Sequence, residues 1–355
     1  VVPIHDLAIQ AREKDLVAGT HGRSFWILDN LTPLYQLNDE MAQENVYLYA
    51  PRKTYRMEGG TFDRPGLALG KNPPNGVVVN YYLRNKPIEK DTFKLEFLGG
   101  EGNLIKSFLG KSEKKTEPGS EQPQSDDEPK APVDSGMNRF VWDMRYPDAA
   151  KVQGAIMWGG STRGPITAPG SYRVRLKVGA RSWTQSFEIM KDPRLETTPV
   201  EFKEQFDFLI KIRDKVSEAH EAVNTIRDIR KQTEDLVKKL EKQKSKDTIA
   251  NVSKKLNEQL KTIEEAIIQV KIKSSQDALN FPIKLNDKIA SLAGVASSAD
   301  TKPTKQTYTV YEELAGELDD LLKKYRAVLE NELVRFNTLV KDMEVPAVIL
   351  KPKDK

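Results

Sequence analysis

The amino-acid sequence predicts a multi-domain α+β protein, with short strands in its first half and long helices in its second. Between about residues 45 and 195, apolar and polar residues alternate with a period of two, as in the segment 172–178 (YRVRLKV). After about residue 197, apolar residues recur every three or four positions, which is the spacing of an amphipathic helix. We therefore expect domains at 1–44, 45–195 and 196–345, followed by a C-terminal tail at 346–355.

The first zone, residues 1–44, predicts a small sheet built from hairpins. Short strands are expected at 3–10, 15–20 and 24–28, with Gly19 and Gly22 marking a turn. Chains below ~40 residues rarely bury enough apolar surface to be stable alone. We therefore expect this sheet to pack on the next domain or on sequence outside the chain.

The second zone, residues 45–195, predicts a β-sandwich of the immunoglobulin or fibronectin kind, because short strands separated by Gly and Pro turns are typical of that class. The expected strands lie near 46–50, 76–83, 92–98, 103–109, 138–144, 171–178 and 182–190. Residues 111–135 contain almost no large apolar side chain. Such a segment cannot offset the entropy of ordering, so a mobile loop is expected there.

The third zone predicts an antiparallel helix bundle. Thr197 or Thr198 can cap a first helix, with Pro199 in its first turn and Glu201 adding favourable negative charge. That helix is expected to end near residue 243, and others are expected at about 248–274, 284–296 and 304–343. Because the connections are short, neighbouring helices should run antiparallel.

Composition excludes several classes of function. The net charge is only +4, with both signs interspersed, so there is no concentrated basic stripe of the kind that binds nucleic acid. No apolar run approaches the ~20 residues that span a bilayer. The chain contains no cysteine, which excludes disulfides, thiolate metal sites and cysteine nucleophiles. It begins at Val1 without an initiator Met or a signal-peptide pattern, and we interpret it as a fragment of a longer protein.

No complete catalytic, metal or cofactor site is predicted. The histidines are His5, His21 and His220, which are widely separated and lack the ligand spacing of zinc sites. Ser171 enters a strand and lacks the glycines of a nucleophile elbow. Asp29 and Asp143 are the best-placed carboxylates for glycoside hydrolysis, but Asp143 is better explained as an ion-paired strand residue.

The candidate binding residues are Trp158 and Arg163, in the glycine-rich segment GAIMWGGSTRGP (154–165). A tryptophan in a sandwich strand is usually part of the core, whereas one in a glycine-rich loop is often exposed. We therefore predict a contact with a glycan or a peptide through these two side chains. The runs of lysine on the expected helices are interpreted as solvated faces, with a docking surface as the alternative.

Several segments resemble known proteins. GTHGRSFWILDN (19–30) resembles the end of a blade in Asp-box propellers of the sialidase and sortilin-like group. Asp29-Asn30-Leu31-Thr32 stands where the Asp-box is expected, and the box itself is incomplete. The further motifs are NPPNGVVVNYYL (72–83), NRFVWDMRYPDA (138–149), TAPGSYRVRL (167–176), KDPR (191–194) and FPIKLNDKIASLAGVASSADTKPTKQ (281–306). Together they resemble the C-terminal half of a family of bacterial proteins described as sortilin-like or Asp-box (BNR-repeat) β-propeller "glycosyl hydrolases".

This resemblance implies a fold and a role. Residues 1–44 would be the remnant of a final propeller blade. The chain would be a non-catalytic accessory region of an exported protein, in the periplasm, at the cell surface or secreted, that braces the propeller and offers a surface to protein or glycan. One alternative is the accessory part of a glycoside hydrolase whose catalytic acids lie in the missing propeller. The other is a sortilin-like peptide-binding receptor or scaffold.

Overall fold

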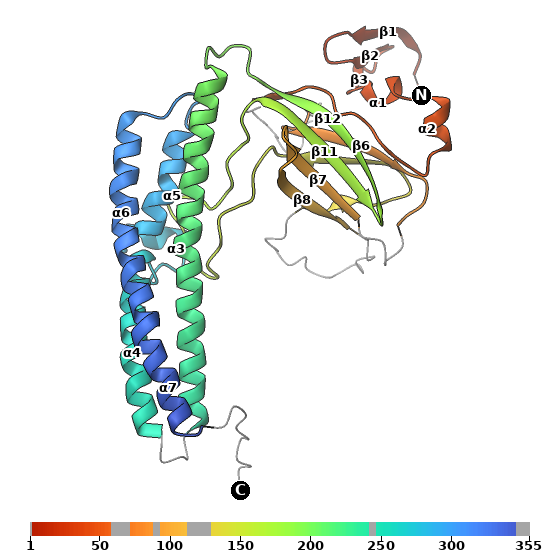
Figure 1. The fold of residues 1–355 in the computed structure, drawn as a ribbon. Coiled ribbons are helices and arrows are strands. Elements are labelled where there is room, and N and C mark those ends of the chain that lie inside the picture. Colours follow the sequence, from red (N-terminus) through yellow and green to blue (C-terminus); the bar gives the residue numbers. More distant parts are fainter. Residues whose placement is uncertain (1, 58–71, 88–92, 112–128, 241–245, 346–355) are drawn as a thin grey trace. The chain divides into compact units, whose positions relative to one another are not determined.

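The structure, a computed structural model, describes residues 2–57, 72–87, 93–111, 129–240 and 246–345 (Figure 1). It is a mixed α/β protein that divides into two compact units. The strand-rich unit contains residues 1–147 and 166–196, and the helical unit contains residues 148–165 and 197–355. The expected mobile loop at 111–135 lies largely, and the tail at 346–355 wholly, outside the described residues. Within the described part, no helix combines the length and apolar composition of a membrane span.

The strand-rich unit begins with a three-stranded antiparallel sheet in the order β1 (Ile4–Gln10), β2 (Asp15–Thr20) and β3 (Phe25–Leu28). Residues paired directly across neighbouring strands share one face of a sheet. One face therefore carries the rows Leu7-Ala18-Trp26 and Ile9-Leu16-Leu28, and the other carries Ala8-Val17-Ile27 and Gly19-Phe25. Both faces are apolar, and β1 and β3 are exposed along their whole length. Two short helices follow, α1 (Thr32–Tyr35) and α2 (Asp39–Gln43).

The remaining strands of this unit form two further sheets around one hydrophobic core. The orders are β10-β6-β4 and β5-β12-β11-β7-β8-β9. The bounds are β4 Val46–Leu48, β5 Thr54–Arg56, β6 Val77–Leu83, β7 Phe93–Gly99, β8 Leu104–Lys111, β9 Ala131–Pro132, β10 Gly136–Trp142, β11 Gly170–Val178 and β12 Arg181–Lys191. Both sheets contribute to the core, in which Trp142 of β10 stacks on Phe97 of β7 with ring centroids 4.4 Å apart.

The seven strands expected from alternation are all present, with ends shifted by a few residues. Two short strands, β5 and β9, were not expected. Each pairs in parallel with an edge of the larger sheet, β5 with β12 and β9 with β8. Strands of two or three residues are too short to show a period of two, so their sequences carry no alternation signal.

In its described residues, the helical unit contains five main helices with one continuous core. They are α3 Pro199–Lys239, α4 Lys246–Ile267, α5 Leu285–Ala296, α6 Lys305–Val328 and α7 Val334–Asp342 (Figure 1). The start of α3 is confirmed as a capping box, in which the Thr198 hydroxyl accepts from the Glu201 N–H and the Glu201 carboxylate accepts from the Thr198 N–H. A π-helical turn, Leu329–Leu333, joins α6 to α7, so the last expected helix is continuous but irregular.

Residues 148–165, which we call the strap, have no regular secondary structure of their own and belong to the helical unit. Ala149 and Val152 are buried in the core of the helices. The chain therefore passes between the two units at three points, after Pro147, after Pro165 and after Glu196.

Candidate functional site

The strap is held along α3 by a row of polar side chains. Four residues on one face of α3 hydrogen-bond the strap's backbone: Ser217, His220, Asn224 and Arg227. The spacings of three, four and three residues place them in one stripe along the helix. Their partners are the N–H of Ala150 and the carbonyls of Ala150, Lys151 and Gln153, at 2.6–3.1 Å. The stripe therefore fixes the course of residues 150–153.

His220 is the buried member of this stripe, with 1% of its surface exposed. Its Nδ1 lies 2.6 Å from the Ala150 carbonyl oxygen, so Nδ1 carries the proton and donates. Its Nε2 then accepts from Nδ2 of Asn286 on α5, at 3.1 Å. Both ring nitrogens are satisfied in the neutral form. Burial lowers the pKa of His220 below its usual 6.5, and the bond to the Ala150 carbonyl opposes that shift.

We expect acid to destabilise the helical unit through His220. Unfolded His220 has a pKa of about 6.5, and the folded value is lower. Below pH 6.5 the unfolded state therefore binds a proton at His220 more strongly than the folded state does. The contribution of neutral His220 to the free energy of unfolding is therefore fully present above pH 6.5. It is lost as the pH drops toward the folded pKa, by at most ~1.4 kcal/mol per pH unit.

Urea unfolding followed by circular dichroism at pH 7.5 and pH 5.5 measures this contribution. In the His220→Gln variant, the difference in unfolding free energy between the two pH values should be smaller than in the unchanged chain, because the contribution of His220 protonation is absent. An unchanged difference would contradict the assignment.

The second half of the strap is bound by one carboxylate. Oδ2 of Asp287 accepts from the Trp158 N–H at 2.8 Å, and Oδ1 accepts from the Gly159 and Gly160 N–H groups at 3.1 and 2.6 Å. Asp287 lies in the first turn of α5 and is 3% exposed. A buried carboxylate that accepts three backbone N–H groups is well satisfied. It fixes three successive peptide groups of the strap.

The two glycines allow the strap to lie directly against α5. A Cβ on Gly160 would meet the Ala290 Cβ at 2.5 Å, and the Asp287 carbonyl and Ser291 nitrogen at 2.9 Å. Two of these three atoms belong to a helix backbone, which cannot move aside. A Cβ on Gly159 would meet the Ser291 hydroxyl at 2.8 Å. The absence of side chains is therefore what lets the strap reach the Asp287 carboxylate.

The structure places both predicted binding residues on the strap. The side chain of Trp158 is 57% exposed although its backbone is bonded to Asp287. Arg163 is also exposed, and its N–H donates to the Ser161 hydroxyl. The ligand contact itself stays a prediction.

The other residues considered as sites do not form a reactive group. His5 in β1 and His21, the residue after β2, have ring centroids 5.2 Å apart. Across the described ranges, no three His, Asp or Glu side chains are arranged to hold a metal ion. The Asp143 carboxylate accepts from the Arg145 N–H at 3.1 Å, which is a turn contact. Ser171 lies in β11, as its position before an alternating segment predicts.

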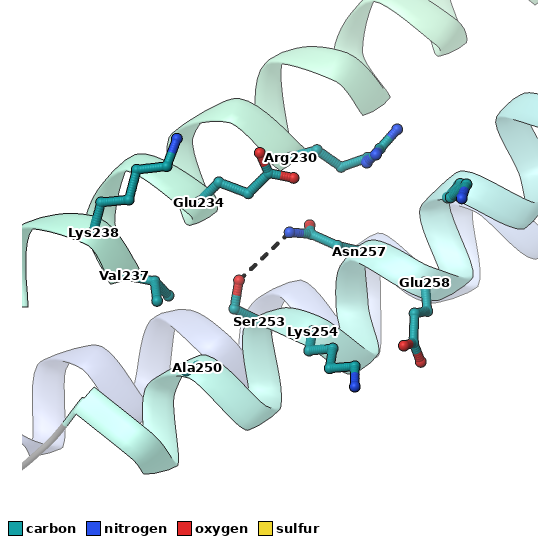
Figure 2. A pocket seen from close by; sticks show the side chains of 10 residues that line it. Arg230, Glu234, Val237, Lys238, Ala250, Ser253, Lys254, Asn257 and Glu258 are labelled. Atoms are coloured by element: carbon teal, nitrogen blue, oxygen red, sulfur yellow. Dashed lines mark hydrogen bonds between the residues drawn. The ribbon is translucent and has the colours of Figure 1, made fainter. Parts of the chain in front are cut away.

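A groove of about 460 Å³ runs between α3 and α4 (Figure 2). Its lining residues are Arg230, Glu234, Val237, Lys238, Ala250, Ser253, Lys254, Asn257, Glu258 and Lys261. Figure 2 shows that Lys238 and Lys254 extend in opposite directions, and that the labelled charges do not converge on one point. Beside it, the Glu264 carboxylate binds Arg227 and Arg230, each at 2.7 Å. We interpret the groove as a packed helix surface with a charged rim.

A second cavity, of about 580 Å³, lies in the strand-rich unit beside residues 12–15, 52–57, 72–76 and 192–194. Several of its charged side chains pair with one another. Arg52 binds Glu13 at 3.4 Å, and Arg194 binds Asp192 through its guanidinium and its backbone N–H. Hydrogen bonds from Arg194 lower the pKa of Asp192 to about 2. This carboxylate is an ion-pair partner and is too acidic to act as a general acid near neutral pH.

Comparisons with protein-family models, with curated proteins and with solved structures give no match to this chain. Function must therefore be inferred from the chain's own residues and contacts.

Sequence reasoning missed Asp287, which binds the strap, and Asn286, which bonds the strap-binding His220, and both are buried. One signal was present. Ser217, His220, Asn224 and Arg227 follow helical spacing beside the apolar seam of the expected helix. A polar stripe next to an apolar one indicates that a further segment of chain packs there.

Proposed function

We propose that the chain is a non-catalytic accessory region of a β-propeller protein, and that β1–β3 form three strands of one propeller blade. The observation that carries this proposal is the exposure of apolar side chains on both faces of the first sheet. Trp26 and Leu28 on one face are 66% and 56% exposed, and Phe25 and Ile27 on the other are 76% and 61% exposed. An antiparallel sheet at a protein surface normally keeps one face polar.

A propeller blade accounts for this pattern. Each blade is a four-stranded sheet arranged radially around a central channel, with neighbouring blades against both of its faces. A blade therefore needs two apolar faces, and the up-and-down order β1-β2-β3 matches the path of a blade. An apolar sheet surface left in water favours aggregation, so these faces must be covered in the functional state.

In this proposal, the rest of the chain braces the propeller. We propose that the two sheets that share one core form an immunoglobulin-like or fibronectin-like sandwich, and that the long helices form an antiparallel bundle; the shared core of each unit supports this interpretation. An exported location follows from the sequence resemblance alone and is part of the same proposal.

Cysteine labelling tests the proposal, because the chain contains no cysteine of its own. Trp26→Cys and Ile27→Cys place one thiol on each face of the first sheet. Val200→Cys, at a residue 74% exposed in the helical unit, is the control. In the 355-residue chain, all three thiols should react with a maleimide at the rate of a free thiol.

In the product of the complete natural reading frame, the thiols at 26 and 27 should react at least about tenfold more slowly and the control should not change. A blade is covered on both faces. Protection of one face alone would indicate ordinary docking, and equal reactivity of all three thiols would also overturn the proposal.

A further inference from the structure

The strap holds a single large apolar side chain in the solvent. Ala149 and Val152 are buried, Ala155 and Met157 pack against the core of the helices, and Ile156 is half-buried, whereas Trp158 is 57% exposed. The Trp158 peptide N–H is fixed by Asp287, while its indole Nε1 donates to no group in the described ranges. A rigid aromatic side chain presented in this way loses little conformational entropy on binding a ligand.

The size of this surface favours a small ligand over a protein. A stable protein interface buries about 800 Å² on each partner, with several apolar residues at its centre. An indole side chain buries at most about 250 Å². The residues that follow it, Ser161, Thr162 and Arg163, are hydroxyl-bearing or charged. The strap therefore presents one flat apolar surface, the Trp158 indole, and polar residues follow it along the chain.

We infer that the strap is a saccharide-binding element, in which the indole of Trp158 stacks on one sugar ring. The axial C–H bonds of a pyranose form an apolar face that matches an aromatic ring, and its equatorial hydroxyls need hydrogen-bonding partners at the ring edge. The free indole N–H is one donor, and the hydroxyls of Ser161, which also accepts from the Arg163 N–H, and of Thr162 lie three and four residues further along the strap as further donors and acceptors. Arg163 adds a positive charge that suits the carboxylate of an acidic sugar. The inference does not depend on the proposed propeller, because the strap belongs to the helical unit.

Asp287 acts here as a positioning residue. In Asp287→Asn, an amide oxygen can still accept from Gly159 and Gly160, but the amide nitrogen faces the Trp158 N–H, and two donors cannot bond each other. The strap should then loosen at Trp158 while the indole itself remains. Affinity for a sugar should fall about three- to tenfold, and hydrogen exchange at the amides of 158–160 should become faster.

The test uses indole ¹⁵N–H resonances of the 355-residue chain, which has only four tryptophans. The probes are cellohexaose, chitohexaose and hexagalacturonate, each titrated to about 10 mM, the range of weak single-ring binding. Only the Trp158 indole signal should shift with at least one of them. Trp158→Ala should lower the affinity at least about tenfold, and Trp158→Tyr should keep most of it. Trp26→Ala is the matched control, since Trp26 is 66% exposed in the other unit, and it should change nothing.

Arg163→Ala distinguishes the sugar classes. Loss of binding to hexagalacturonate alone would assign an acidic saccharide, and unchanged binding to the neutral sugars would assign stacking as the main contact. Hexaproline serves as a peptide probe. A shift with hexaproline and with none of the three sugars would overturn the inference, and so would the absence of any shift of the Trp158 signal.

Discussion

Gly160→Ala is expected to destabilise the helical unit by about 3 kcal/mol. The added methyl group would lie 2.5 Å from the Ala290 Cβ and 2.9 Å from two backbone atoms of α5. Because the helix cannot give way, the strap must move off it and lose hydrogen bonds to Asp287. Urea unfolding followed by circular dichroism at 222 nm reports this loss, since the helical unit dominates that signal.

Gly294→Ala is the control for this substitution. Gly294 lies in α5, the helix that Gly160 contacts, and a Cβ on Gly294 would meet nothing within 4 Å. Alanine is the better helix former, so this change should stabilise the unit by about 0.5–1 kcal/mol. The same chemical change is thus expected to have opposite signs at the two positions. Effects of equal sign and size would mean that the strap does not pack on α5 as described.

Glu264→Ala is expected to cost about 3 kcal/mol of stability. The Glu264 side chain is only 4% exposed and binds both Arg227 and Arg230 at 2.7 Å. Its removal leaves two guanidinium groups without their shared carboxylate, and Arg230 already has a buried Nε without a partner. Both arginines are about one-third exposed, which places the cost at the low end for a buried ion pair.

Glu265→Ala is the matched control at the next position. Glu265 is 45% exposed and pairs with Lys261 at 3.7 Å, so its removal should cost less than about 0.5 kcal/mol. Glu264→Gln keeps a hydrogen-bond acceptor, so its cost in stability should lie between those of Glu264→Ala and Glu265→Ala. The same urea titration measures all three variants. Equal costs for residues 264 and 265 would contradict the burial of the ion pair.

Regular secondary structure was predictable because its signal is local. The alternation at 172–178 predicted β11, and Thr198, Pro199 and Glu201 marked the first residues of α3. Arg230 and Thr233 lie at positions of α3 where the three- and four-residue apolar spacing would place an apolar residue. In the structure, Arg230 binds Glu264 and the Thr233 hydroxyl bonds the Asn257 side-chain oxygen. Each of these polar residues therefore pairs with a side chain of α4, a contact that the sequence pattern did not predict.

The strap was not predictable from its own sequence. The hydrogen bonds that hold it on α3 and α5 join backbone groups to side chains 67 to 129 residues away. Every residue has the same backbone groups, so the sequence does not show which of them are bonded. Its glycines are explained only by the closeness of α5, which local patterns do not reveal. Exposure of Trp158 agrees with its place in a glycine-rich loop, but the side chain that fixes it, Asp287, could not be assigned without the structure.

The chain crosses between its units three times, and this determines the order in which their parts can form during synthesis. Residues up to 196 complete the strand-rich unit, whereas Trp158 must wait for Asp287, which is 129 residues further along. At about 5–20 residues per second, the ribosome needs roughly 6–26 s to supply that carboxylate. During this interval the strap has emerged, but the side chains that will hold it do not yet exist. A fragment that begins at Thr197 meets the converse problem, because His220 and Asp287 would be made without the segment that they bind.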